Sequence, residues 1–385
     1  MNTPLYEKIY TYILEKIQDG DLNKGNRVPS EKELAEKFNV SRITSKKALD
    51  ILAEKKIIER IRGKGSFVTT VPPVPDELNH NLKDVFIPTS EEDEMRLVGL
   101  ILPDFSEYFG LNFVKTVEKV CSKLNIHLLI KRTYGLIEEE EKTITSMLQL
   151  GVDGLIMIPV NGEHYNNALL KIVLSDFPFV LADRFLKGIP ASSVSTDNTL
   201  ASQQLTDYLI SLGHEKIAII SPPPEGISAI EERINGFHIA FSRQGLKLNP
   251  DYMLTNLMSS LPLNVHSEQL KQIKEEDLDK IKRFILQHPE LTAFVVCEYD
   301  LVLLLSLILK DLGKKIPEDY SVVCFDNPYT NLEPKFTYIK QNEEIMAEKA
   351  VDLLLAKLNG ESVPQHIYIE FDLVKGASTS SIQYK

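Results

Sequence analysis

The sequence predicts an α/β chain with two domains, a small helical one followed by a larger one built on doubly wound parallel sheets. Three observations lead to this prediction. The chain has 385 residues, whereas a single hydrophobic core usually stops growing near ~300. Residues 71–95 contain prolines, asparagines and an acidic end but no helical or strand period, which is typical of a linker. After residue 96, short apolar stretches alternate with amphipathic helices, the order that produces a parallel sheet covered by helices.

The larger domain contains two such series, which predict two lobes. In the first series, LVGLILP, HLLIKR, GLIMIPV, PFVLAD and KIAIIS have the composition of buried strands, and helices are expected over 111–124, 138–150, 164–175 and 198–212. In the second series, ERINGFHIAFSRQG, LVLLLSLILKDLG and EEIMAEKAVDLLLAKLNG read as helices, and TAFVVCE and YSVVCFD as strands. The predicted boundaries are residues 1–70 for the small domain, 71–95 for the linker and 96–385 for the large domain.

The small domain contains two short helices joined by a tight turn. Ser30 with Glu33 three residues later has the spacing of a capping box, which starts a helix by satisfying its free N–H groups. Asn39 suits the left-handed conformation that ends this helix, and Ser41 caps the next one. This is the pattern of a helix–turn–helix.

The second helix buries one face and carries polar and basic residues at its exposed start. Its N-terminal turn contains Arg42, Thr44, Ser45 and Lys46. Free N–H groups at a helix N-terminus add to the positive field of such side chains, which suits contacts with phosphates and base edges. A β-hairpin follows, with Lys64 at its tip between Gly63 and Gly65, and these glycines permit a close approach to the nucleic acid.

The charge distribution supports DNA binding by one end of the chain. Residues 1–70 contain 14 Lys and Arg against 10 Asp and Glu, a net charge of +4. Because the whole chain carries −12, the remaining 315 residues carry −16. A small basic domain attached to an acidic one is expected for a protein that binds a polyanion through that domain alone.

The sequence gives no indication of catalysis, of a metal or cofactor, or of a membrane. The three cysteines, Cys121, Cys297 and Cys324, are far apart and are expected to be buried apolar residues. No metal-binding histidine pattern, phosphate-binding loop or nucleophile turn is present in the sequence. No apolar run approaches the ~20 residues that span a bilayer, and the N-terminus lacks the pattern of a signal peptide. We therefore expect a cytoplasmic protein that is not an enzyme.

The first 70 residues resemble the winged helix–turn–helix of the gluconate-repressor (GntR) family of bacterial regulators. The similarity covers PLYEKIYTYI, VPSEKELAEKFNVSRITSKKALDIL and IIERIRGKGSFV. It implies that Arg42 contacts bases, that Tyr6 contacts a phosphate and that the wing lies near the minor groove. The predicted DNA-binding residues are Tyr6, Ser30, Glu31, Ser41, Arg42, Thr44, Ser45, Lys46, Gly63, Lys64 and Gly65. One departure is Lys56, where the family usually has glycine.

The remainder resembles the effector domain of the lactose-repressor (LacI) family, which shares its fold with type I periplasmic sugar-binding proteins. The similarity rests on stretches such as GLILPDFSEYFGLNFVKTVEKV, IPEDYSVVCFDN and FTYIKQNEEIMAEKAVDLLL. A GntR-type domain followed by such an effector domain resembles the arabinose-responsive repressors of bacteria. The resemblance implies a repressor that a monosaccharide releases from operator DNA.

The effector site is expected beyond the carboxyl ends of the strands, where ligands bind in open α/β sheets. Asp104, Arg184 and Asp326 each follow a predicted strand, and paired carboxylates and guanidinium groups can satisfy sugar hydroxyls. The resemblance adds further candidates, including Asp300. The family usually has its Asn-Asp pair one residue earlier, so either the strand is longer by one residue or Tyr299 takes the place of the aspartate. The predicted ligand-binding residues are Asp104, Phe109, Lys131, Arg184, Arg233, Asp300, Asp326 and Gln341.

Other readings remain open for parts of this site and for the whole chain. Arg184 could instead pair with Asp183, and Arg233 could cap its helix beside Glu231 and Glu232. The main alternative function is a sugar- or nucleotide-using enzyme. The sequence lacks a Gly-x-Gly-x-x-Gly turn after the first strand of the large domain, and this absence argues against a nucleotide-binding enzyme. A transport-binding protein would need export. Because operators are usually near-palindromic, a DNA-binding regulator of this kind is expected to be a homodimer.

Overall fold

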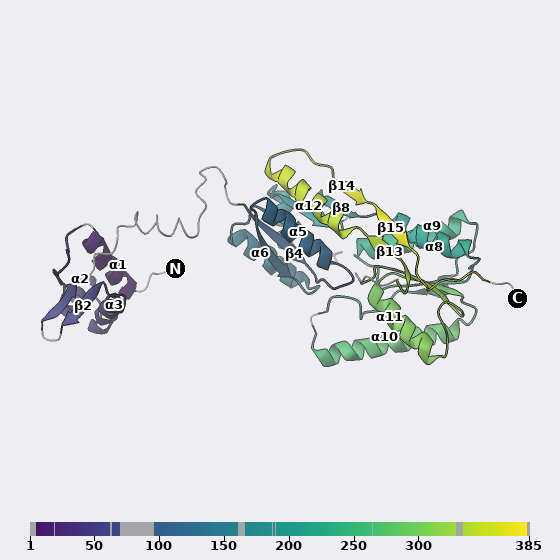
Figure 1. The fold of residues 1–385 in the computed structure, drawn as a ribbon, viewed down its shortest axis with the longest axis horizontal. Helices are drawn as coiled ribbons and strands as arrows, with labels where there is room; N and C mark the ends of the chain where they lie inside the picture. The colour runs from purple at the N-terminus through teal and green to yellow at the C-terminus, as the bar shows by residue number, and fades with distance from the viewer. Residues whose placement is uncertain are drawn as a thin grey trace. The chain divides into compact units, whose positions relative to one another are not determined.

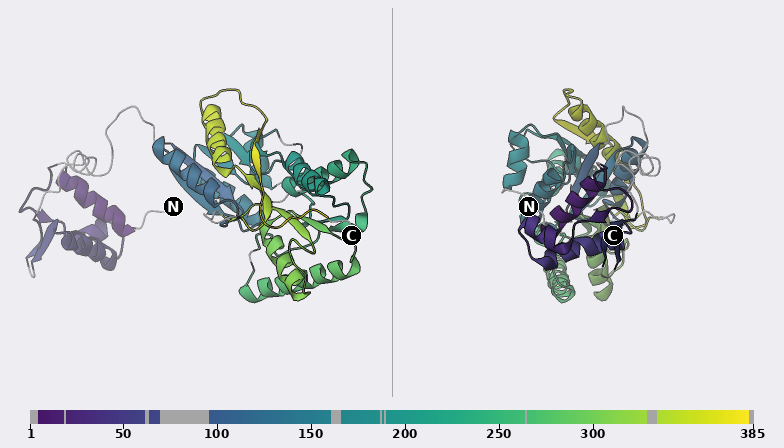
Figure 2. Two further views of the ribbon diagram at one scale, coloured as in Figure 1. Left: turned by 45° about the vertical axis from the view of Figure 1, so that its right-hand side comes forward. Right: turned by 90° about the vertical axis from the view of Figure 1, so that its left-hand side faces the viewer.

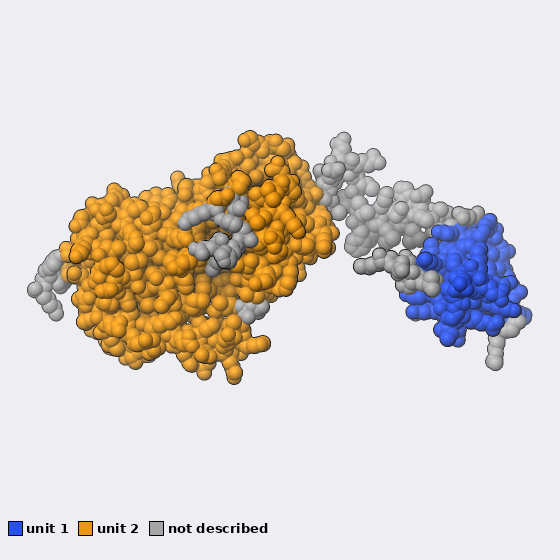
Figure 3. Space-filling model, turned by 180° about the vertical axis from the view of Figure 1, so that it is seen from behind, with its two compact units in different colours: residues 1–94 blue, residues 95–385 orange. Residues whose placement is uncertain are grey.

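The computed structural model describes residues 5–18, 20–61, 64–69, 96–160, 166–186, 188, 190–263, 265–328 and 334–382. The chain divides into two compact units, residues 1–94 and residues 95–385, here called the head and the body (Figure 3). The predicted linker over 71–95 lies outside the described residues. No helix in the described ranges is long and apolar enough to cross a bilayer.

The described residues of the head form three helices and a three-stranded antiparallel sheet with the strand order β1-β3-β2. Helix α1 buries Ile9, Ile13 and Ile17, which recur every four residues and therefore lie on one face. They pack against apolar side chains of the other helices and of the sheet, so the head has its own core. Its elements are α1 (Leu5–Gln18), β1 (Arg27–Val28), α2 (Glu31–Phe38), α3 (Arg42–Glu54), β2 (Ile58–Ile61) and β3 (Gly65–Val68).

The predicted helix–turn–helix is confirmed. The backbone N–H of Ser30 donates to Glu33 Oε2 at 2.7 Å, and the N–H of Glu33 donates to Ser30 Oγ at 3.3 Å, which completes the capping box of α2. Asn39 ends this helix in the left-handed conformation, with φ 51° and ψ 50°. Ser41 caps α3 by accepting a hydrogen bond from the N–H of Thr44 at 3.2 Å.

Lys56 occupies a position that favours glycine. It follows α3 with φ 58°, in the left-handed region where a Cβ atom meets the following carbonyl. This explains why the GntR-type pattern usually has glycine at this turn. The Lys56 carbonyl accepts a hydrogen bond from Thr69 Oγ1 at 2.6 Å, which a glycine would retain.

We expect Lys56→Gly to stabilise the head by about 0.5–1 kcal/mol, because relief of the left-handed strain exceeds the added entropy of the unfolded chain. Calorimetric thermal unfolding of the full chain measures this as a rise in the transition of the head. Lys55→Gly is the matched control, because Lys55 has φ −78° and gains nothing from glycine. A head destabilised equally by both substitutions would contradict the strain argument.

The first lobe of the body is a six-stranded, fully parallel sheet with the order β14-β8-β7-β6-β4-β5. Helices α5 and α12 cover one face and pack against each other, while α6 and α7 cover the other face (Figure 1). The strands are β4 (Leu97–Leu102), β5 (His127–Arg132), β6 (Gly154–Met157), β7 (Phe179–Ala182), β8 (Ser192–Thr196) and β14 (His366–Ile369). The helices are α5 (Leu111–Lys123), α6 (Ile137–Gln149), α7 (Asn167–Leu174) and α12 (Glu343–Leu358).

The second lobe has a sheet with the order β10-β9-β11-β12-β13-β15, parallel except for the antiparallel pair β13 and β15. Helices α8 and α9 cover one face and α10 and α11 the other (Figure 2). The strands are β9 (Ile217–Ile220), β10 (Met253–Leu254), β11 (Ala293–Val296), β12 (Ser321–Phe325), β13 (Thr337–Gln341) and β15 (Phe371–Val374). The helices are α8 (Asn198–Ser211), α9 (Ser228–Arg243), α10 (Ser267–Gln287), α11 (Tyr299–Asp311) and the 3₁₀ turn Pro250–Tyr252.

The chain passes between the two lobes three times, at residues 196–198, 341–343 and 369–371. Strand β8 ends in the first lobe and α8 begins in the second, β13 and α12 make the reverse passage, and β14 and β15 lie in different sheets. The sequence analysis placed α8 and β9 in the first series of elements. The structure corrects this, because both pack in the second lobe, and a strand–helix rhythm alone does not say where a chain changes sheet.

A buried histidine fastens the C-terminal segment of the body to the second sheet. His214 is 3% exposed, and its Nε2 lies 2.9 Å from Ser321 Oγ and 3.0 Å from the carbonyl oxygen of Ser380, while Nδ1 lies 2.9 Å from Thr292 Oγ1. Burial lowers the pKa of His214 below its usual value, which outweighs the raising effect of the Ser380 carbonyl. The folded body therefore holds this imidazole neutral.

We expect the contribution of His214 to stability to be complete above about pH 6.5 and to be lost below it, by at most about 1.4 kcal/mol per pH unit, because only the unfolded chain protonates readily there. Urea unfolding of wild type and His214→Gln from pH 7.5 to 5 isolates this contribution as a difference between the two curves. Buried carboxyl groups with a raised pKa, such as Glu140 at about 7, have the opposite effect, because they favour the folded state as the pH falls. Both proteins contain these groups, so their contribution cancels in the difference between the two curves. His266→Gln, at an exposed position, should leave the wild-type curve unchanged.

Candidate functional site

The exposed start of α3 is the first candidate site, and it lies in the head. Arg42 and Lys46 are exposed, and Thr44 Oγ1 lies 2.9 Å from the capping Ser41 Oγ, which fixes both hydroxyls at the helix start. The sequence analysis did not single out Ile43, whose side chain is 80% exposed. An apolar side chain at this place on a groove-binding helix suits contact with a thymine methyl group.

Ser45 requires a correction. The sequence analysis placed it with the residues that face DNA, but its side chain is fully buried. Its hydroxyl donates to the carbonyl oxygens of Glu31 at 2.7 Å and Arg42 at 3.1 Å. Position 45 lies one turn inside α3, on the face that packs against α2, so Ser45 joins the two helices instead of facing solvent.

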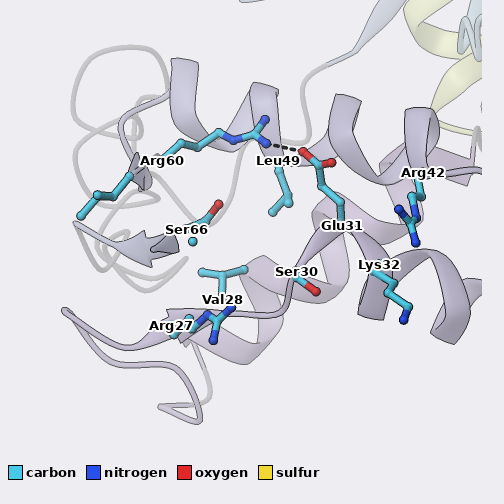
Figure 4. Close-up of a pocket in the computed structure, with 11 residues that line it drawn as sticks. Arg27, Val28, Ser30, Glu31, Lys32, Arg42, Leu49, Arg60 and Ser66 are labelled. Atoms are coloured by element: carbon cyan, nitrogen blue, oxygen red, sulfur yellow. Dashed lines mark hydrogen bonds and ion pairs between the residues drawn. The ribbon is translucent and has the colours of Figure 1, made fainter. Parts of the chain in front are cut away.

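A groove of about 510 Å³ lies between the start of α2, the start of α3 and the wing strands (Figure 4). In it, Arg60 of β2 reaches across to the carboxylate of Glu31 and also pairs with Asp50 of α3. The predicted residues Ser30, Glu31, Arg42 and Gly65 line this groove. The structure adds Arg27, Lys32 and Arg60 to it, which the sequence analysis did not name as DNA-binding residues.

The wing and α1 complete the basic surface of the head. Lys64 is exposed at the tip of the hairpin, and Gly63 lies outside the described residues. Gly65 has φ 115°, and a Cβ there would lie 2.9 Å from Arg27 Nε, so glycine lets Arg27 cross the base of the wing. The Tyr6 ring lies 4.0 Å from Lys47 Nζ, which packs this predicted phosphate contact against α3.

The second candidate site is a cavity of about 320 Å³ in the body. Residues that follow β4, β6 and β7 of the first sheet line it together with residues that follow β11 and β12 and the end of β13 in the second. The cavity is therefore at the carboxyl ends of strands of both sheets, where ligands bind in such folds. It brings together seven of the eight predicted ligand residues, namely Asp104, Phe109, Arg184, Arg233, Asp300, Asp326 and Gln341.

Lys131 is the exception. It lies near the end of β5, the edge strand of the first sheet, is exposed and is not among the residues that line the cavity. Asp104 does line the cavity, but its carboxylate also accepts a hydrogen bond from Arg132 at 2.9 Å. Among the described residues, the edge strand β5 therefore affects the cavity only through Arg132, which donates to Asp104.

Arg233 is the most buried cation of the cavity, at 4% exposure. Its Nε donates to Asn198 Oδ1 at 2.8 Å and its Nη1 donates to the carbonyl oxygen of Cys297 at 2.6 Å. The guanidinium also lies 3.9 Å from the centroid of the Phe325 ring. The alternative that Arg233 only caps its helix is excluded, because these three partners lie on other elements.

Asp326 and Gln341 form a pair next to Arg233. Gln341 Nε2 donates to both carboxylate oxygens of Asp326, at 2.9 and 3.1 Å. Burial raises the pKa of Asp326 to about 7, and the charge of Arg233 opposes this shift. Asp326 has φ 64°, a conformation that non-glycine residues rarely adopt and that is enriched at functional sites.

Asp183 repeats this geometry at the end of β7. It has φ 61° and is 6% exposed, and burial raises the pKa of its carboxyl group. Arg184 Nε lies 3.5 Å from Asp183 Oδ2, as the alternative interpretation proposed, while its Nη1 donates to the carbonyl oxygen of Pro159 at 3.3 Å. Both residues nevertheless line the cavity, so the ion pair and a ligand contact are compatible.

Aromatic rings form the apolar part of the wall. Phe105, Tyr108 and Phe109 follow β4, and the Tyr108 ring lies 4.6 Å from that of Tyr299 at the start of α11. The flat faces of such rings suit the C–H face of a sugar. Tyr299 and the predicted Asp300 both line the cavity.

Ser259, Lys274 and Glu298 are among the polar cavity residues that the sequence analysis did not name. Ser259 Oγ and Gln341 Oε1 are buried and have no hydrogen-bond partner among the described residues. The N–H groups of Met258 and Ser259 donate to Asp277 at 2.8 Å each, which holds this loop in place. No sequence signal marked the loop, because it follows a two-residue strand and precedes a helix that the analysis had not assigned.

The described residues contain no group of three or more histidine, cysteine, aspartate or glutamate side chains that could hold a metal ion. The three cysteines are buried and unpaired, as expected. The cavity is lined by hydrogen-bonding groups, charged groups and aromatic rings.

Comparisons with known proteins agree with this division. Residues 5–68 match the family described as bacterial regulatory proteins, gntR family, and residues 206–379 match a periplasmic binding protein-like domain. The arabinose metabolism transcriptional repressor of Geobacillus stearothermophilus is 26% identical over 370 residues, which cover 94% of this chain and 93% of that protein.

Solved structures of transcription regulators have the fold of the body. The transcription regulator CcpA of Lactococcus lactis superimposes with a TM-score of 0.63 at 23% identity, covering 74% of this chain and all of the other. A LacI family regulator from Enterococcus faecium, solved with bound ribose, gives a TM-score of 0.61 at 21% identity over 75% of this chain and all of the other. These proteins are regulators and not enzymes.

Proposed function

We propose that this chain controls sugar-utilisation genes. It does so as a ligand-responsive transcriptional repressor that joins a GntR-type helix–turn–helix domain to a LacI-type effector domain. A monosaccharide such as L-arabinose binds the body and releases the head from its operator. The observation that carries the proposal is the composition of the body cavity, in which carboxylates, guanidinium groups, an amide and hydroxyls converge beside aromatic rings. Sugars are the ligands that offer many hydroxyls and an apolar ring face together.

Arg42, Lys46 and the groove at the start of α3 support the assignment of DNA binding to the head. Arg42 can reach guanine in the major groove while the helix start faces a phosphate. Arg60 holds Glu31 and α3 in one arrangement, so the surface is preorganised. Since one head covers one half-site, we infer a homodimer that binds a near-palindromic operator.

The coupling between sugar and DNA tests this function. The operator is first obtained by selecting the full chain's preferred sites from random duplex DNA. Operator affinity is then measured by fluorescence anisotropy with and without each sugar of a monosaccharide panel, and sugar affinity by calorimetry with and without operator. We expect the effector to weaken operator binding about 5–150-fold, a coupling of typical size, and the operator to weaken sugar binding by the same factor.

Two results would contradict the proposal in different ways. A sugar that tightens the operator complex would make the protein an activator or a corepressor-dependent regulator. If sugar binds but neither affinity changes, the cavity serves a purpose other than release from DNA.

A further inference from the structure

The charges that line the body cavity are not balanced in pairs. Among the described residues, no lysine or arginine nitrogen lies within 4 Å of the carboxylates of Glu298, Asp300 or Asp326. Lys274 lowers the pKa of Asp300 from a greater distance, against the larger raising effect of burial. The cavity therefore contains carboxylates that no contacting cation neutralises.

The two arginines of the cavity already have oxygen partners in the protein. Arg233 donates to Asn198 and Cys297, and Arg184 donates to Pro159 and lies beside Asp183. A phosphate or carboxylate that bound either arginine would have to displace these partners, which leaves Lys274 as the other cation that lines the cavity. It would also meet the carboxyl groups of Glu298, Asp300 and Asp326, of which Asp300 is exposed, and like charges brought together are unfavourable.

Of the three, Glu298 is the one with a buried carboxylate oxygen that accepts no hydrogen bond from a described residue. It follows β11 and precedes the first turn of α11, but its side chain does not cap that helix. Its Oε2 is buried and has no hydrogen-bond partner in the described part of the chain. Burial raises the pKa of Glu298, and a hydrogen bond from the Ser260 side chain and the charges of Arg233 and Arg184 oppose this.

Other buried atoms in the wall indicate what a ligand must supply. Gln341 is 3% exposed and its Oε1 has no partner among the described residues, and the same holds for the hydroxyl of Ser259 at 9% exposure. Glu298 Oε2 and Gln341 Oε1 are acceptors, so they require donors. Sugar hydroxyls are donors, whereas an ionised acid or phosphate group presents only acceptor oxygens at physiological pH.

We propose that the cavity selects uncharged sugars against sugar acids and sugar phosphates, and that Glu298 imposes this selection by accepting a hydrogen bond from a ligand hydroxyl. The inference rests on the proposed function and narrows its ligand class. It assigns to Glu298 a specificity role that the sequence analysis did not foresee.

The first test compares sugars of one ring stereochemistry and different charge on the wild-type full chain. L-Arabinose, D-galactose and D-galacturonate share the configuration of their ring hydroxyls, and D-galactose 6-phosphate completes this set. A glucose set consists of D-glucose, D-glucuronate and D-glucose 6-phosphate. In any set whose neutral member binds, we expect calorimetry to show that the neutral sugar binds about 100-fold or more tightly than the anionic members. An anionic member that binds as tightly as its neutral counterpart overturns the inference but leaves sugar-responsive regulation intact.

The second test assigns the selection to Glu298. Glu298→Gln keeps the shape of the side chain and removes its charge, and should narrow the ratio between neutral and anionic affinities to about tenfold or less. Glu275→Gln is the matched control, because Glu275 is exposed on α10 and does not line the cavity. Circular dichroism and the unfolding midpoint show whether Glu298→Gln is folded. If the folded variant keeps the wild-type ratio between neutral and anionic affinities, the role of Glu298 is overturned. If no neutral sugar of a full monosaccharide panel binds the wild type, the proposed function itself fails, and charge selection fails with it.

Discussion

Replacing Arg233 by alanine is expected to destabilise the body by about 3–5 kcal/mol, because two buried acceptors lose a charged donor. Those acceptors are Asn198 Oδ1 and the Cys297 carbonyl, and the contact with the Phe325 ring is lost as well. Removal of the guanidinium also leaves Asp326 without the charge that holds its pKa down. Urea unfolding of the full chain, followed by a signal from the body, measures the loss.

The same variant should not bind sugar at a low temperature, where it remains folded. Arg243→Ala is the matched control, since Arg243 is exposed at the end of the same helix, α9. A change below about 0.5 kcal/mol is normal for a surface position and is expected there. If Arg233→Ala lowered the free energy of unfolding as little as the control does, the hydrogen bond from Arg233 to Asn198, in the passage at 196–198, would not contribute to stability as expected.

Replacing Arg42 by alanine is expected to cost roughly 1–3 kcal/mol of operator binding and much less on random DNA, because a bidentate contact with guanine discriminates between bases. Arg42 is suited to this contact, since it is exposed at the first position of α3 and lines the groove of the head. Fluorescence anisotropy on the selected operator and on scrambled DNA gives the two losses.

Lys64→Ala provides the comparison within the same domain. A lysine at the wing tip meets phosphates, so its loss should weaken both DNAs similarly and reduce the salt dependence of binding. The positional assignment of α3 fails if Arg42→Ala and Lys64→Ala have equal effects on both DNAs.

The head could be predicted almost completely from the sequence because its signals are local. A capping box, a left-handed Asn39 and a second capping serine each act within four residues, and all three occur as expected. The exception, Ser45, depends on the packing of α2 against α3, which a residue's polarity does not reveal. The departure at Lys56 also has a local explanation. Lys56 has φ 58°, in the left-handed region that favours the glycine usual in the family.

The body could be predicted in its elements but less well in its connections. Strand β8, SSVST, escaped detection because it is polar in composition although buried throughout. The cavity residues at strand ends were found, since strand ends can be read from apolar runs. Ser259 and Glu298 were not, because their importance arises from which loops and helix starts the fold brings together.

The three passages between the lobes have a consequence for synthesis on the ribosome. The core of the first lobe contains Met346, Val351 and Leu354 from α12 and Ile369 from β14, although its first strand begins at Leu97. About 270 residues must therefore be made before this core can close, and such distant contacts slow folding. Meanwhile the apolar faces of β4 and β6 remain open to aggregation or to chaperones. The core of the head involves only residues between Ile9 and Val68, so the head can fold first. The emerging chain then acquires its DNA-binding surface before it can respond to a ligand.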